Sequence, residues 1–145
     1  MADLTKIKWL YPPNFEGTYE TGTKNGHRRH VILCTNYSDG TGEDQELKLK
    51  RTDMLTSEGQ TPSKLVIEKI DYHVAGMTVK IEYNNDNEEV IAMIYSGDGC
   101  IDFRPQGGFT PEDDGDNLAG DIIFTTSNQT NNDSYNIILT VRLKQ

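Results

Sequence analysis

Apolar and polar residues alternate with a period of two along several parts of the chain. The longest alternation covers residues 135–143, where the apolar positions are Tyr135, Ile137, Leu139, Val141 and Leu143. Residues 77–83 alternate in the same way and precede a turn-forming cluster of Asn and Asp at 84–87. Because successive side chains of a strand point to opposite faces of a sheet, both stretches predict strands with one buried face. Nowhere does the apolar spacing of an amphipathic helix persist over three turns.

Three details of the expected strands follow from the same pattern. Residues 90–95 are continuously apolar and lead into Ser, Gly and Asp, which predicts a central strand covered on both faces. In residues 64–74 the alternation changes phase near Lys69, and this change predicts a β-bulge. Leu47 and Leu49 are two positions apart, so we expect them to point to the same face of their strand.

The strand-like segments together number about eight, and the loops between them are rich in Gly, Asn, Asp, Ser and Thr. The remaining predicted strands are 30–37, 46–51, 100–104 and 121–126. Many short strands with this spacing predict an all-β fold, an antiparallel β-sandwich of the jelly-roll type. We expect a single sandwich domain over residues 16–145, preceded by an extended N-terminal arm over residues 1–15.

The N-terminal arm carries aromatic residues next to two prolines. The Pro-Pro pair 12–13 holds the backbone extended and prevents a helix. The residues that we expect to bind a partner are Trp9, Leu10, Tyr11 and Phe15. The alternative is that Trp9 and Tyr11 fold back over one end of their own sandwich.

Acidic residues outnumber basic ones by 23 to 14, which gives a formal net charge of −9. Residues 84–121 contain ten acidic residues and one arginine, so this segment alone carries the net charge of the whole chain. An excess of this sign repels the phosphate backbone, and we expect no nucleic-acid partner. The segment is either a set of solvated loops or a negative face that meets a basic partner or a cation.

Hydrophobic residues are too dispersed to predict a membrane segment. No apolar run approaches the ~18–20 residues that cross a bilayer, and residues 1–6 lack the apolar stretch of a secretory signal. We therefore expect a soluble chain that is not secreted and has no membrane partner.

The one dense basic patch of the sequence follows the arm. Its members, candidates for polar contacts with a partner, are His27, Arg28, Arg29 and His30. In so acidic a chain, such a patch is better suited to a carboxylate-rich neighbour than to DNA.

The candidate catalytic and metal-ligating groups do not form a recognisable set. His30 and Cys34 share a face of their predicted strand, but two ligands leave a zinc site incomplete. Cys34 and Cys100 lie in apolar surroundings, so we expect both to be buried free thiols. We expect Asp102 to be a strand residue whose side chain either faces solvent or pairs with Arg104 on the same face. The motifs of nucleophilic serine and of phosphate-binding loops do not occur, and we expect no catalytic residue, metal or cofactor.

Residues 112–117 concentrate carboxylate and amide oxygens within one turn-forming segment. Oxygen ligands of this kind are those that calcium prefers, although the spacing differs from that of an EF-hand loop. The segment is therefore either a cation site or a solvated loop tip.

Three segments of the chain, residues 8–15, 102–109 and 120–126, carry a resemblance to a known group of proteins. They read KWLYPPNF, DFRPQGGF and GDIIFTT. In this pattern the chain resembles small β-rich virion proteins of tailed bacteriophages, notably phages that infect marine bacteria.

The resemblance implies a structural role as a capsid decoration, or cement, protein. Such proteins are jelly-roll or β-sandwich subunits, often homotrimers, which sit on the outer shell at threefold positions and tie neighbouring capsomers together. The implied partners are the major capsid protein and other copies of this chain. The implied location is the exterior of the capsid, after synthesis in the host cytoplasm.

Other functions remain open at the level of sequence. A carbohydrate-binding β-sandwich would use exposed aromatic residues such as Tyr37, Tyr95 or Phe109 as a platform for sugar rings. A tail or neck component of the virion could have the same fold. A small β-barrel enzyme is the third class.

Overall fold

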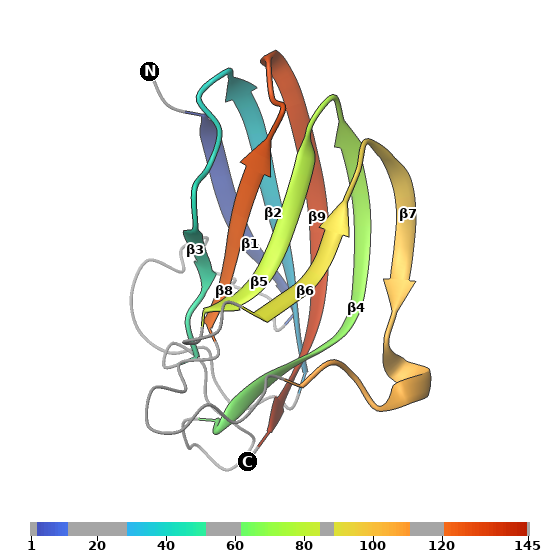
Figure 1. Cartoon of the computed structure of the whole chain (residues 1–145). Helices are drawn as coiled ribbons and strands as arrows, with labels where there is room; N and C mark the ends of the chain where they lie inside the picture. The colour runs from blue at the N-terminus through green and yellow to red at the C-terminus, as the bar shows by residue number, and fades with distance from the viewer. Residues whose placement is uncertain (1–2, 12–28, 52–61, 85–88, 111–120, 145) are drawn as a thin grey trace.

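Two antiparallel β-sheets pack face to face in the protein (Figure 1). A computed structural model of the chain describes residues 3–11, 29–51, 62–84, 89–110 and 121–144. Within these residues, one sheet has five strands in the order β1-β2-β9-β4-β7, and the other has four in the order β3-β8-β5-β6. The predicted all-β antiparallel sandwich is confirmed.

The strands of the two sheets are between 4 and 14 residues long. The five-stranded sheet comprises β1 (Leu4–Tyr11), β2 (Arg29–Asp39), β4 (Lys64–Ala75), β7 (Gly97–Asp102) and β9 (Asn131–Lys144). The four-stranded sheet comprises β3 (Glu46–Leu49), β5 (Thr78–Asn84), β6 (Glu89–Ile94) and β8 (Asp121–Ser127). A short 3-10 helix, η2 (Arg104–Gln106), follows β7.

The order of the strands is that of a jelly roll. Strands β5 and β6 form a hairpin, and the pairs β4–β7, β3–β8 and β2–β9 are nested outside it as antiparallel neighbours. The chain from β2 to β9 is thus one long hairpin rolled into two sheets. Strand β1 is added to the edge of the five-stranded sheet beside β2.

Residues 4–11 of the expected N-terminal arm form β1 and are hydrogen-bonded to β2 along the strand. Residues 12–15 lie outside the described part of the chain. The described segment of the arm is extended, and it is a strand of the sandwich.

The core lies between the two sheets and follows the predicted alternation. In β9 every second residue from Tyr135 to Leu143 is buried, and in β5 the same holds for Val79, Ile81 and Tyr83. The largest fully buried side chains include Tyr83, Tyr135 and Phe124. Truncating a buried aromatic side chain lowers the free energy of unfolding by about 3–5 kcal/mol. The apolar layer is therefore the main interaction that holds the two sheets together.

The predicted β-bulge in the segment 64–74 is confirmed. The register of β4 against β9 shifts between Ile67 and Lys69, so Glu68 is the extra residue. The bulge allows Ile67 before it and Ile70 after it to point into the core, since both are fully buried.

Two predictions about individual strands were wrong. Among the described strands, β6 pairs only with β5 and is therefore an edge strand, and Val90 and Met93 on it are exposed. Leu47 is exposed whereas Leu49 is buried, because the register of β3 shifts between them and Lys48 turns inward. Apolar content alone does not distinguish a central from an edge strand, and a bulge in so short a strand leaves no phase pattern to recognise.

Candidate functional site

The side chain of Trp9 packs strand β1 against the rest of the sandwich. The indole is buried, with 6% of its surface exposed, and its Nε1 donates a hydrogen bond to Nδ1 of His30, 2.8 Å away. The two rings meet edge to face, with their centroids 6.5 Å apart. Trp9 therefore belongs to the core of its own chain, where it is not accessible to a partner.

The two residues that follow Trp9 lie at the surface. The register of β1 against β2 shifts between Trp9 and Tyr11, so Leu10 is the extra residue of a bulge. Leu10 is 40% and Tyr11 is 47% exposed. Of the residues expected to bind a partner, these two are placed where they can do so, and Phe15 lies outside the described residues.

Strand β1 exposes several large apolar side chains although it lies at the edge of its sheet. Its exposed large apolar residues are Leu4, Ile7, Leu10 and Tyr11. In the described part of the chain, β1 pairs with β2 along one edge and with no strand along the other. An apolar edge strand of this kind offers backbone groups and side chains to another chain.

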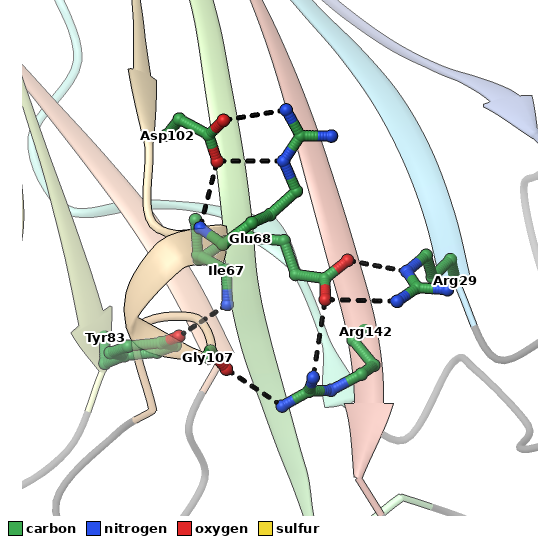
Figure 2. Close-up of polar contacts among 8 residues, drawn as sticks. Arg29, Ile67, Glu68, Tyr83, Asp102, Gly107 and Arg142 are labelled. Atoms are coloured by element: carbon green, nitrogen blue, oxygen red, sulfur yellow. Dashed lines mark hydrogen bonds and ion pairs between the residues drawn. The ribbon is translucent and has the colours of Figure 1, made fainter.

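The basic patch at the start of β2 divides between two environments. His27 and Arg28 lie outside the described residues, and His30 is buried against Trp9. Arg29 binds Glu68 of the same chain through Nε, which lies 2.7 Å from Oε1 (Figure 2). The carboxylate raises the pKa of Arg29, through the hydrogen bond and its charge.

Glu68 is the centre of a polar cluster that sequence reasoning missed. Its carboxylate is almost fully buried and also binds Arg142 of β9 at 3.4 Å, as Figure 2 shows. The second nitrogen of Arg142 donates to the carbonyl of Gly107 at 3.1 Å. The cluster ties three strands and the segment after β7 together, and the bulge at Glu68 brings the carboxylate to this position.

Asp102 and Arg104 form an ion pair, the second of the two arrangements expected from the sequence. Two nitrogens of Arg104 bind the two carboxylate oxygens of Asp102, at 2.9 and 2.7 Å. The side-chain hydrogen bond from Arg104 lowers the pKa of Asp102 to about 2. Both side chains are at the surface, so the pair fixes a turn and leaves Asp102 ionised.

The three aromatic residues considered as a sugar platform lie in different environments. Tyr37 and Tyr95 are exposed, at 54% and 67%. Phe109 is half-buried and packs against Tyr83 and Phe103, with centroids 5.9 and 5.4 Å away. Phe109 is thus part of the edge of the core, and the two tyrosines are the ones open to a ligand.

A second polar cluster lies between the sheets. The carboxylate of Glu43 accepts hydrogen bonds from Asn36 Nδ2, at 2.8 Å, and from the hydroxyl of Tyr135, and it forms an ion pair with the buried Lys48. Burial, together with the negative charge of Glu43, raises the pKa of Tyr135. Buried charges of this kind are stable only when paired, so the cluster is structural, and it joins β2 and β9 to β3.

Asp3 precedes β1 and binds the end of β2 and the loop that follows it. Its carboxylate accepts hydrogen bonds from the side chains of Asn36 and Ser38 and from the backbone N–H groups of Asp39 and Gly42, at 3.0 to 3.2 Å. Partial burial acts to raise the pKa of Asp3, but the four hydrogen bonds outweigh it and lower the pKa below its ordinary value. The start of β1 is thereby locked to the loop after β2.

A groove of about 350 Å³ lies beside Asp3, at the end where β1 begins. The residues that line it include Leu4, Lys6, Thr35, Tyr37, Ser134 and Asn136. Asn36 and Tyr135 also border it, and their side chains bind Glu43 in the interior. The hydrogen bonds to Glu43 therefore fix the two residues at the bottom of the groove.

The two cysteines differ in environment. Cys34 is fully buried, and burial raises the pKa of its thiol to about 12, so it is protonated at neutral pH. Cys100 is exposed, and the prediction that it is buried was wrong. The reason is that Cys100 lies on the edge strand β7 opposite Asp71, and an edge strand can expose even an apolar segment.

The part of the chain that the structure describes has neither a metal-binding cluster nor a membrane-spanning helix. In those residues, no three His, Cys, Asp or Glu side chains are grouped so as to hold a metal ion. The same residues contain no helix that is long and apolar enough to cross a membrane. The oxygen-rich segment 112–117 lies outside them.

The chain matches no model of a protein family, no curated protein and no solved structure.

Proposed function

We propose that the protein is a non-enzymatic structural protein of a bacteriophage virion, a decoration or cement protein that binds the outer shell of the capsid. Three features support this proposal. The chain resembles small β-rich virion proteins in three segments, it folds as a jelly roll, and its N-terminal strand presents an apolar edge.

The observation that carries the proposal is the edge of β1. A long, apolar edge strand favours aggregation unless another chain covers it, and natural proteins usually protect such edges. Strand β1 has lysines at positions 6 and 8 but keeps four large apolar residues exposed. A strand of a neighbouring subunit added at the end of this edge that carries Leu10 and Tyr11 would bury those two side chains.

Leu10 and Tyr11 are the proposed contacts at the end of β1 that leads into residues 12–28. They lie next to Trp9, whose burial fixes β1 on its own sheet. The sandwich thus provides a rigid base for the two exposed side chains. A rigid base reduces the entropy lost on binding, which favours affinity.

Binding to purified shells tests the proposal. Shells of the phage that lack this protein are mixed with the wild type, with Leu10→Asp and with Tyr11→Asp, and bound protein is measured after sedimentation. Interface aromatic and aliphatic anchors contribute about 2 kcal/mol or more, so each variant should bind at least about tenfold more weakly. Leu47→Asp on β3 is the control, since Leu47 is also half-exposed.

Loss of binding in the β1 variants with unchanged binding of Leu47→Asp supports the proposal. Equal binding of all variants would exclude the edge of β1 as the docking surface. Failure of the wild-type protein to bind shells at all would exclude the decoration role.

A further inference from the structure

The groove beside Tyr37 is built from two rows of side chains that cross three neighbouring strands. In the first row, Leu4 of β1 is paired with Tyr37 of β2, and Tyr37 is paired with Ser134 of β9. Directly paired residues of antiparallel strands point to the same face of the sheet. The first row therefore presents an alkyl group, an aromatic ring and a hydroxyl side by side.

The second row is parallel to the first and two residues away. Lys6 is paired with Thr35, and Thr35 is paired with Asn136. Because Thr35 and Tyr37 are two positions apart on β2, both rows lie on the outer face of the five-stranded sheet. The second row adds a cation, a hydroxyl and an amide to the same groove.

The aromatic ring in the groove is held in place before any ligand binds. The hydroxyl of Tyr37 donates a hydrogen bond to Oδ1 of Asn132, at 2.8 Å, while about half of the side chain remains exposed. Under the groove, Asn36 is held by Asp3 and Glu43. A preorganised site of this kind loses little conformational entropy on binding.

The combination of groups matches the chemistry of a sugar. An exposed, fixed aromatic ring can stack on the C–H face of a pyranose, and hydroxyl and amide groups beside it can bind sugar hydroxyls. The volume of about 350 Å³ is large enough for one or two sugar rings but too shallow to enclose a larger ligand.

The positive charge of Lys6 at the groove favours sugars that carry a carboxylate. Lys6 forms no ion pair with any of the described residues, and it is exposed at the edge of the groove. Among the described residues that line the groove, none carries a carboxylate. A single ammonium beside hydroxyl and amide groups is complementary to one carboxylate on a sugar.

We propose that this groove, formed by Leu4, Lys6, Thr35, Tyr37, Ser134 and Asn136, binds a hexuronate unit of an acidic polysaccharide. The ring stacks on Tyr37, the carboxylate binds Lys6, and the sugar hydroxyls bind Thr35, Ser134 and Asn136. Leu4 and Tyr11 are about 23 Å apart at opposite ends of β1, so the groove stays open when Leu10 and Tyr11 contact a shell. The binding activity is thus separate from the decoration role.

The free protein in solution tests this inference, without shells. Trigalacturonate is titrated into isotopically labelled protein, and amide chemical shifts are followed by NMR. We expect shifts that cluster on residues 4–6, 35–37 and 134–136, with an affinity in the millimolar range that is typical of small contacts of this kind. Maltotriose, which lacks carboxylates, should bind at least about fivefold more weakly, as expected from the loss of one charged contact.

Two substitutions and one control locate the site. Tyr37→Ala should weaken trigalacturonate binding by about tenfold or more, the effect of losing an aromatic contact. Lys6→Met should weaken trigalacturonate binding but leave maltotriose binding unchanged. Tyr95→Ala removes an even more exposed tyrosine away from the groove and should have no effect.

The outcomes separate the possibilities. Shifts confined to the groove and lost in Tyr37→Ala support the inference. Absence of shifts with trigalacturonate, or an equal loss in Tyr95→Ala, overturns it. Equal binding of maltotriose and trigalacturonate overturns the assignment of a hexuronate. Chemical shifts distant from residue 37 show that each variant remains folded.

Discussion

The indole N–H of Trp9 points at Nδ1 of His30, and this hydrogen bond of 2.8 Å joins the N-terminal strand to the first strand of the jelly roll. Both side chains are buried. An imidazole that accepts at Nδ1 carries its proton on Nε2, so the bond selects one tautomer of the neutral ring. Strand β1 is thus attached to β2 by a side-chain contact as well as by the backbone ladder.

This contact predicts how the N-terminal strand contributes to stability. Trp9→Ala should lower the free energy of unfolding by about 3–5 kcal/mol, because it leaves a cavity in the core and removes a partner from buried His30. Tyr11→Ala, at the exposed end of the same strand, should change it by less than about 1 kcal/mol. Urea denaturation followed by circular dichroism measures both, and equal effects would mean that Trp9 is not part of the core.

The bulge of β4 makes Glu68 the most sensitive carboxylate of the sheet. Glu68→Ala removes the buried carboxylate that both Arg29 and Arg142 bind. Because the two arginines are themselves partly exposed, we expect the free energy of unfolding to fall by about 1.5–3 kcal/mol, the range for hydrogen bonds to a charged group. The control is Asp102→Ala, which removes an exposed carboxylate from an arginine pair of similar geometry and should leave stability almost unchanged. Thermal unfolding of the two variants tests this difference, and a similar melting temperature for both would refute the role assigned to burial.

Much of this architecture could be predicted from the sequence. The features that could not be predicted have physical reasons. The strands β5 and β9 follow from strict alternation, and the bulge at Glu68 follows from the change of phase beside it. The polar clusters around Glu43 and Glu68 could not be predicted, because bulges and loops bury these two carboxylates although charged residues normally lie at the surface. Lys48 is a further example, since alternation with Leu47 and Leu49 places it outside whereas it is buried.

The groove was only partly predictable for a related reason. Tyr37 was recognised as an exposed aromatic residue, but its neighbours Lys6 and Asn136 come from strands that are distant in sequence. Their proximity depends on the order β1-β2-β9, which a strand pattern does not specify. Long-range pairing therefore assembles the site from residues that individually have no distinguishing motif.

Asp3 predicts a dependence of stability on pH. Its pKa is lower in the folded protein than its ordinary value of 3.8, so its contribution is present above that value and is lost as the pH falls through the folded-state pKa. Asp3→Asn should therefore destabilise the protein at pH 7 by about 1–3 kcal/mol. Urea denaturation at pH 7 and at pH 3 should give a smaller difference between variant and wild type at the lower pH, and a constant difference would contradict the role of the charge.

The exposed edge of β1 also predicts self-association. A small β-sandwich gains stability by burying an additional face, and we expect a homotrimer in solution at micromolar concentration. Light scattering over a hundredfold dilution measures the mass. Leu10→Asp should shift the protein towards the monomer, whereas Leu47→Asp should not, and a monomeric wild type at every concentration would exclude the trimer without excluding binding to a shell.

The two thiols should differ sharply in reactivity. Burial raises the pKa of Cys34 to about 12 and shields its sulfur, so it should react with a thiol reagent at pH 8 only when the protein unfolds. Cys100 is exposed and should react in the folded state, although desolvation and the nearby Asp71 raise the pKa of its thiol and slow the reaction. Titration with an aromatic disulfide reagent should give a fast reaction that is absent in Cys100→Ser and a second reaction that appears with urea at the unfolding midpoint. Fast labelling of both thiols in the native protein would mean that the two sheets separate readily around Cys34.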